Sequence, residues 1–80
     1  MNQILDWLAE AGRHRETISK EQHITVDLIV WTNCIIVRGY LQDAQYLDKV
    51  TYDDFDQARS NLLIHSIDRV VDNLKKDVHG

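Results

Sequence analysis

The stretch TYDDFDQARSNLLIHSIDRVVDNL, from Thr51 to Leu74, constrains the fold most because it combines a helix start with a sustained apolar stripe. The Thr51 hydroxyl can cap the first turn, and Asp54 can reach back to the amide of the cap residue. Apolar side chains follow at helical spacing, at Leu63, Ile67, Val70 and Leu74. The pattern predicts an amphipathic helix over 52–77. Its apolar arc spans roughly half the circumference, so it needs two neighbours or a partner chain.

The length of the chain and its single cysteine limit how it can be stabilised. Eighty residues make one small domain, spanning 1–80, with a core that is only marginally sufficient. Cys34 is the only cysteine, so an internal disulfide is excluded and homo-oligomerisation is the expected supplement. A lone thiol in an apolar run fits a reducing compartment, and no signal peptide or membrane-spanning stretch is visible. We therefore expect a cytoplasmic domain.

The charge of the chain bears on its partners. The net charge is −4, and the only basic cluster is the short group around Arg13 and Arg15. Phosphate binding needs a clustered basic face, so the composition argues against a general nucleic-acid binder. No cofactor, small-molecule substrate or membrane is implied.

The segment 24–47 is ambiguous between helix and strand. Its sequence is rich in β-branched and aromatic residues, which favour strands, and Thr32 and Asn33 could form a turn between two of them. However, this turn lacks the glycine that favoured hairpin turns require, and clean alternation of apolar and polar residues is absent. As a helix, the segment is apolar nearly all the way round. Gly39 would then mark a close crossing or a bend.

We therefore expect an all-α domain, a helical bundle. Asn2 caps a short N-terminal helix over 3–11, with Gly12 as its C-terminal cap, and two long antiparallel helices follow over 22–47 and 52–77. A central helix that is apolar on every side needs more cover than this chain supplies, so its spare face should contact another molecule. An α+β domain whose central segment forms a β-hairpin stays open as the alternative.

The chain also resembles a known family between about Asp27 and Leu74. The resemblance is carried by TYDDF at 51–55, by Arg59, and by the apolar run that closes with Asp72 and Leu74. It is a resemblance to the effector-associated domains of bacterial conflict and defence systems. It implies a small helical, death-fold-like adaptor that pairs with a like domain on a partner protein and so recruits an effector or sensor, without catalysis. The alternative is a small helical dimeric regulator, antitoxin-like or an RNA-binding hairpin.

Catalytic and metal sites are not expected. Cys34, His65 and Asp68 are the residue types of a thiol-based triad, but Cys34 lies in the most apolar run, where nothing would activate it. No two of the four histidines stand at the i, i+4 spacing that binds a metal on one helix face.

Two oppositely charged groups are the candidate interaction residues. The acidic group is Asp53, Asp54 and Asp56, and the basic group is Arg13 and Arg15. Complementary patches on one molecule suit head-to-tail self-association.

Arg59 is the sixth candidate interaction residue. It falls near the centre of the apolar arc of the expected helix 52–77, where a charge is costly unless it is paired. We expect either a structural ion pair with Asp27 or Asp43 or a contact with a partner.

Overall fold

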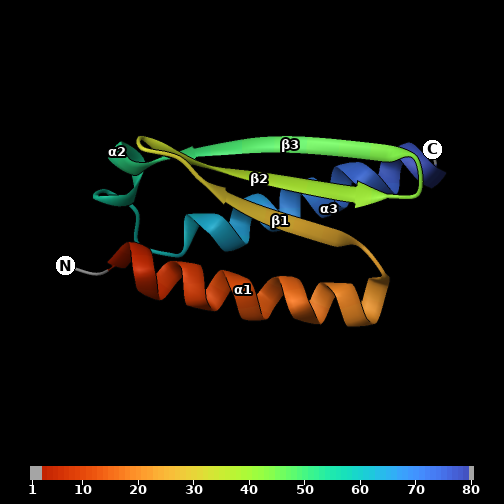
Figure 1. Ribbon diagram of the computed structural model, residues 1–80, viewed down its shortest axis with the longest axis horizontal. Coiled ribbons are helices and arrows are strands. Elements are labelled where there is room, and N and C mark those ends of the chain that lie inside the picture. The colour runs from red at the N-terminus through yellow and green to blue at the C-terminus, as the bar shows by residue number, and fades with distance from the viewer. Residues whose placement is uncertain (1–2, 80) are drawn as a thin grey trace.

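The computed structural model describes residues 3–79 and shows a two-layer α+β domain (Figure 1). Its elements are α1 (Gln3–Gln22), β1 (Thr25–Val30), β2 (Cys34–Leu41), β3 (Ala44–Thr51), α2 (Tyr52–Phe55) and α3 (Leu62–His79). The strands form an antiparallel sheet in the order β1-β2-β3. α3 packs against β2 and β3, and α1 lies beside α3 and β1. One face of the sheet is therefore open.

The expected all-α helical bundle is wrong, because the segment 22–47 forms two strands and the start of a third. The hairpin alternative is correct for β1 and β2. Their turn closes without glycine: the Trp31 N–H donates to the Cys34 carbonyl at 2.9 Å. The Tyr52 hydroxyl braces it from outside by donating to the Trp31 carbonyl at 2.6 Å. The next turn places Gln42 at φ 55°, a left-handed conformation that the sequence did not signal.

Strand alternation is present in β2 but hidden in its sequence. Ile35 and Val37 are fully buried against the helices. Ile36 and Arg38, which alternate with them along the strand, lie on the open face and are half-buried. Because the open face also carries apolar residues, the period of two does not appear as a change between apolar and polar. This is why the segment looked apolar on every side of a helix.

The first helix is longer than expected. α1 runs through Gly12 to Gln22, and His23, with φ 58°, takes the left-handed position that we had assigned to Gly12. The His23 N–H donates to the Ser19 carbonyl at 3.0 Å and closes the last turn. Asn2, the expected cap, lies outside the described residues.

The expected helix 52–77 begins at the right residue but is split in two. α2 starts at Tyr52, yet the Thr51 hydroxyl donates to the Asp54 carboxylate at 2.9 Å instead of capping an amide. The chain leaves the helix after Phe55 and re-enters at Leu62. The predicted apolar stripe is confirmed: Leu63, Ile67, Val70 and Leu74 are at most 1% exposed.

The core explains why the apolar arc of α3 is so wide. The sheet covers one side of α3, and α1 covers another. The Trp7 and Phe55 rings, with centroids 4.8 Å apart, join α1 to α2 at one end. Gly39 does mark a close crossing, but of β2 over α3, beside Val70 and Leu74. The chain thus supplies the two neighbours that the arc requires.

Candidate interaction surface

The structure places the predicted acidic and basic groups on separate elements. Asp53 and Asp54 are exposed in α2, Asp56 is exposed just after it, and Arg13 is exposed in the middle of α1. Arg15 is half-buried, and its guanidinium donates to the Val26 carbonyl of β1 at 3.3 Å. No ion pair joins the two groups within residues 3–79. Their pairing between molecules stays a prediction.

Arg59 lies outside the helix in which we expected it. It is exposed in the segment 56–61 between α2 and α3, so no burial forces it to pair. Asp27, one of its expected partners, accepts a hydrogen bond from Arg38 at 3.2 Å on the open face of the sheet. Arg59 instead lines a hollow beside the start of α3.

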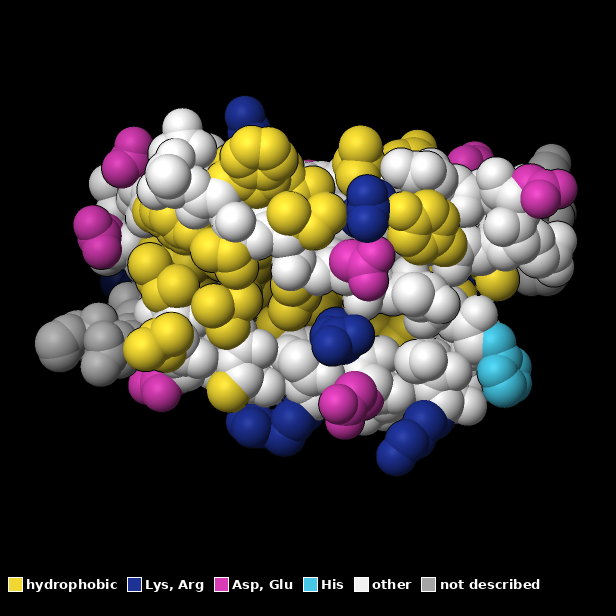
Figure 2. Space-filling model, in the orientation of Figure 1, with side chains coloured by type: hydrophobic (Ala, Val, Ile, Leu, Met, Phe, Trp, Pro, Cys, Tyr) yellow, Lys and Arg dark blue, Asp and Glu magenta, His cyan; other side chains and the backbone are white. Residues whose placement is uncertain are grey.

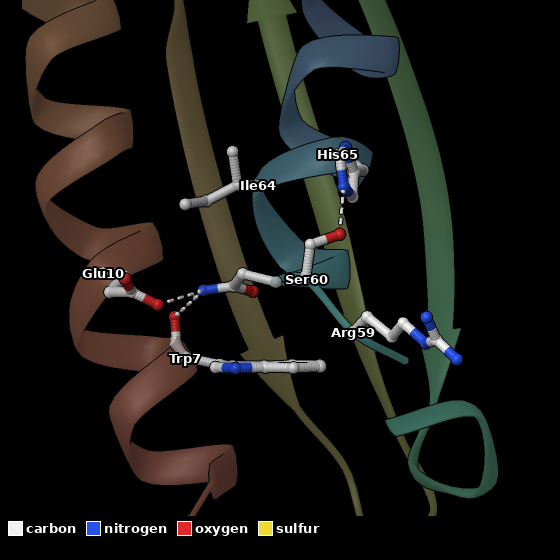
Figure 3. Close-up of a pocket in the computed structure, with 7 residues that line it drawn as sticks. Trp7, Glu10, Arg59, Ser60, Ile64 and His65 are labelled. Carbon is white, nitrogen blue, oxygen red and sulfur yellow. Dashed lines mark hydrogen bonds between the residues drawn. The ribbon is translucent and has the colours of Figure 1, made fainter. Parts of the chain in front are cut away.

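That hollow has a volume of about 400 Å³ and lies where α1 meets the start of α3 (Figure 3). Asn61 dominates it: the Asn61 amide donates to the Trp7 carbonyl at 3.0 Å and to the Glu10 carboxylate at 3.1 Å. The Asn61 side-chain oxygen accepts the Leu63 N–H at 2.9 Å and so caps α3. Through these three hydrogen bonds Asn61, one of the residues that line the hollow, joins α1 to α3.

The same hollow contains a serine and a histidine at hydrogen-bonding distance. Ser60 Oγ and His65 Nε2 are 2.8 Å apart, a separation that a nucleophile and its base would have. Both are exposed, and the carboxylate of Glu10 is bonded to Asn61 on the other side of the hollow (Figure 3). Within residues 3–79, no hydrogen bond joins a third side chain to the His65 imidazole.

Two residues of the thiol-based triad considered from the sequence, His65 and Asp68, have other hydrogen-bond partners. Asp68 pairs with His14 at 2.7 Å and joins α3 to α1, and His65 pairs with Ser60. Among residues 3–79, no group of three or more His, Cys, Asp or Glu side chains is arranged to hold a metal ion. In the same range, none of the helices combines the length and the apolar character needed to cross a membrane.

Four large apolar side chains of the described chain are more than half exposed: Leu5, Val30 and Trp31 lie in segments at one end of the molecule, and Leu47 lies in the middle of β3. The exposed fractions are 62% for Leu5, 58% for Val30 and 60% for Trp31. Leu5 is near the start of α1, Val30 is the last residue of β1, and Trp31 directly follows it. Figure 2 shows apolar side chains gathered between α1 and the sheet at the end where α1 begins. We call Leu5, Val30 and Trp31 together the apolar strip.

The side of α1 that faces β1 is open. Leu5, Leu8, Gly12 and Arg15 recur every three to four residues and so share this side, whose direction is fixed by the bond from Arg15 to Val26. A Cβ atom on Gly12 would meet nothing within 4 Å. Gly12 was the sequence signal for this surface, but we had interpreted it as a helix cap.

The outer edge of β1 presents unpaired backbone groups. Because the Trp31 N–H points to β2, alternation directs the N–H and C=O groups of Leu28 and Val30 away from β2. The same groups of Val26 point outward too, and its carbonyl is occupied by Arg15. From Leu28 to Trp31 the edge carries no charged side chain. An edge of this kind is open to pairing with another strand.

The other edge of the sheet, β3, is protected by charge. Lys49 is exposed on it, and Asp48 points to the helix side, where it accepts hydrogen bonds from Ser66 at 2.6 Å and from Arg69 at 2.8 Å. Burial raises the pKa of Asp48, but these bonds, the charge of Arg69 and the Lys49 backbone N–H outweigh it, and the pKa falls below 3.8. Edge lysines and inward-pointing charges discourage strand pairing.

Comparisons of the chain with models of protein families, with curated proteins and with solved structures find no match. What the domain does must therefore be inferred from its architecture and its surface. The architecture defines a small α+β domain with one open sheet face and one open strand edge.

Proposed function

We propose that this domain is a non-catalytic protein–protein interaction module that recruits a partner protein. The observation that carries the proposal is the apolar strip, where three large side chains, Leu5, Val30 and Trp31, are each more than half exposed. Tryptophan is enriched among residues that dominate binding energy at interfaces, and Trp31 stands at the end of an unpaired strand edge. We also place the module in the cytoplasm, because its one cysteine is a free thiol.

The family resemblance contributes less to this proposal than the surface does. It implied a helical adaptor, whereas most of the matched span before Thr51 lies in strands. Like-with-like pairing and a role in bacterial defence stay predictions. The helical regulator, antitoxin-like or RNA-binding, is not retained because it required a helical chain.

Site-specific crosslinking in the native cell tests the proposal. A photo-crosslinking amino acid is placed at Trp31, and at Gln45 of β3 as a control that is also exposed. We expect one defined adduct from position 31 and none from position 45, with the adduct lost when Leu5→Lys is added. A second copy in the adduct would establish like-with-like pairing. The same diffuse products from both positions would contradict the proposed recruitment.

A further inference from the structure

The apolar strip has the geometry of a site for an extended strand. On one side lies the edge of β1, whose Leu28 and Val30 backbone groups point outward without partners in the sheet. On the other side lies the flank of α1. β1 starts beside the end of α1 and runs away from it toward Val30, so the two elements diverge where the apolar side chains gather (Figures 1 and 2).

Gly12 is an independent sign that this space has a use. A glycine in the interior of a 20-residue helix is destabilising, and it permits a backbone or ligand to approach the helix closely. Within residues 3–79, a Cβ added at Gly12 would meet no atom within 4 Å. The glycine therefore keeps the flank of α1 open between Leu8 and Arg15.

The unpaired backbone groups and the flanking side chains define what would bind. Outward N–H and C=O groups on an edge strand are satisfied by another strand, with alternate side chains pointing to the helix side. There they would meet Leu5 and Leu8, so apolar side chains fit. A strand antiparallel to β1 brings its C-terminal end beside Val26, where Arg15 lies at 3.3 Å from the carbonyl. A carboxylate at that end would find a cation.

We propose that the cleft between the α1 flank and the β1 edge binds an extended peptide segment of a partner protein by antiparallel strand addition. The segment is apolar at alternate positions and has a carboxylate at its C-terminal end. This proposal rests on the proposed function and specifies how the partner is held. A whole second domain is a poorer occupant, because α1 already forms the outer wall of the cleft.

Selection from a library of random octapeptides displayed with free C-termini tests the proposal. We expect enrichment of sequences with apolar residues at alternate positions. The affinity of one selected peptide, synthesised with a fluorescent label, is then measured by anisotropy in its free-acid and C-terminal amide forms. Replacing Arg15→Gln should weaken the acid form about tenfold and leave the amide form unchanged.

Two pairs of matched variants locate the site. Val30→Pro removes an outward N–H from the β1 edge, and Leu47→Pro does the same on the β3 edge at a residue of nearly equal exposure, 57% against 58%. We expect at least a tenfold loss of affinity for the first and no change for the second. Gly12→Leu fills the cleft while favouring the helix, and Ala9→Leu adds the same side chain at an exposed position of α1. Only the first should abolish binding.

These experiments can reject strand addition without rejecting the proposed interaction module. Failure to enrich any peptide, or equal binding by wild type and Gly12→Leu, would overturn strand addition. If the crosslink from Trp31 persisted in that case, the recruitment module would stand with a different mode of binding. Should Val30→Pro fail to fold, as judged by circular dichroism, the Gly12→Leu and Ala9→Leu pair decides.

Discussion

Gly39 shows how a single residue sets the distance between the sheet and its helix. A Cβ at this position would lie 2.5 Å from Val70 Cγ1 and 2.9 Å from Leu74 Cδ1, both in the buried stripe of α3. With an added Cβ, the Val70 and Leu74 side chains or the backbone around them would have to shift. The two glycines that can be compared, Gly39 and Gly12, therefore have opposite roles, because one is surrounded and the other is open.

We expect Gly39→Ala to destabilise the domain by about 1–3 kcal/mol, the usual cost of overpacking a core. Gly12→Ala should stabilise it by about 0.5–1 kcal/mol, because alanine favours the helix and meets nothing there. Urea denaturation of both variants measures the difference. Adding Val70→Ala to Gly39→Ala should recover part of the loss relative to Val70→Ala alone. Equal stability of the two glycine variants would contradict the crossing.

Asp48 makes the stability of the domain depend on pH. Its folded-state pKa lies below the ordinary value of 3.8, so the carboxylate stabilises the fold above that value, and the contribution is lost as the pH falls through the folded-state pKa. We expect Asp48→Asn to cost about 1–2 kcal/mol at pH 7. The difference from wild type should shrink below about pH 4. Denaturation at a series of pH values checks this, with the same substitution at the exposed Asp53 as the control.

At the scale of elements, the junction between α1 and α3 depends on one side chain. Asn61 caps α3 through the Leu63 N–H and reaches Trp7 and Glu10 of α1 with its amide. A second link, between His14 and Asp68, lies further along the same two helices. The cap and the interhelical bonds come from different atoms of Asn61, so they can be separated by substitution.

We expect Asn61→Ala to cost about 2 kcal/mol, because it removes both the cap and the bonds to α1. Asn61→Ser keeps a capping oxygen and should recover about half of that loss. Thermal unfolding followed by circular dichroism compares them with Ser60→Ala, whose exposed hydroxyl contacts only His65 in the described chain and should change little. If the serine variant were no better than alanine, the cap would not contribute.

At the scale of the whole molecule, the charged groups and the apolar strip are distinct candidate surfaces. The acidic residues lie in and just after α2, the basic residues lie in the middle of α1, and the strip lies between α1 and the end of β1. Association through the charged groups and association through the apolar strip should depend differently on salt concentration. Charge-driven association weakens as the ionic strength rises, whereas apolar contacts do not.

If the acidic group of one molecule meets the basic group of another, converting Asp53 and Asp54 to lysine should abolish association. Converting Arg13 and Arg15 to aspartate as well should restore part of it. Light scattering at low and high salt measures the mass. An association that survives the first pair of substitutions, but is lost on Leu5→Lys, would assign it to the apolar strip instead.

The sequence by itself determined the features that depend on neighbouring residues. The buried stripe of α3 and the helix start at Tyr52 follow from spacing along a few turns, and both are present. The sequence of β2 does not alternate between apolar and polar residues, because Ile36 on the open face is as apolar as its buried neighbours Ile35 and Val37. The prediction of a helix there was wrong for this reason. A segment apolar on both faces has no period from which to choose helix or strand.

Only the tertiary structure decided that choice. The strand state of 24–47 is stabilised by ladders between β1, β2 and β3, and by the packing of Gly39 on Val70 and Leu74. These contacts join residues far apart in the chain, so local propensity does not contain them. The candidate site depends on the same contacts, because the open edge of β1 and the flank of α1 exist only once both elements are placed against α3 and the sheet.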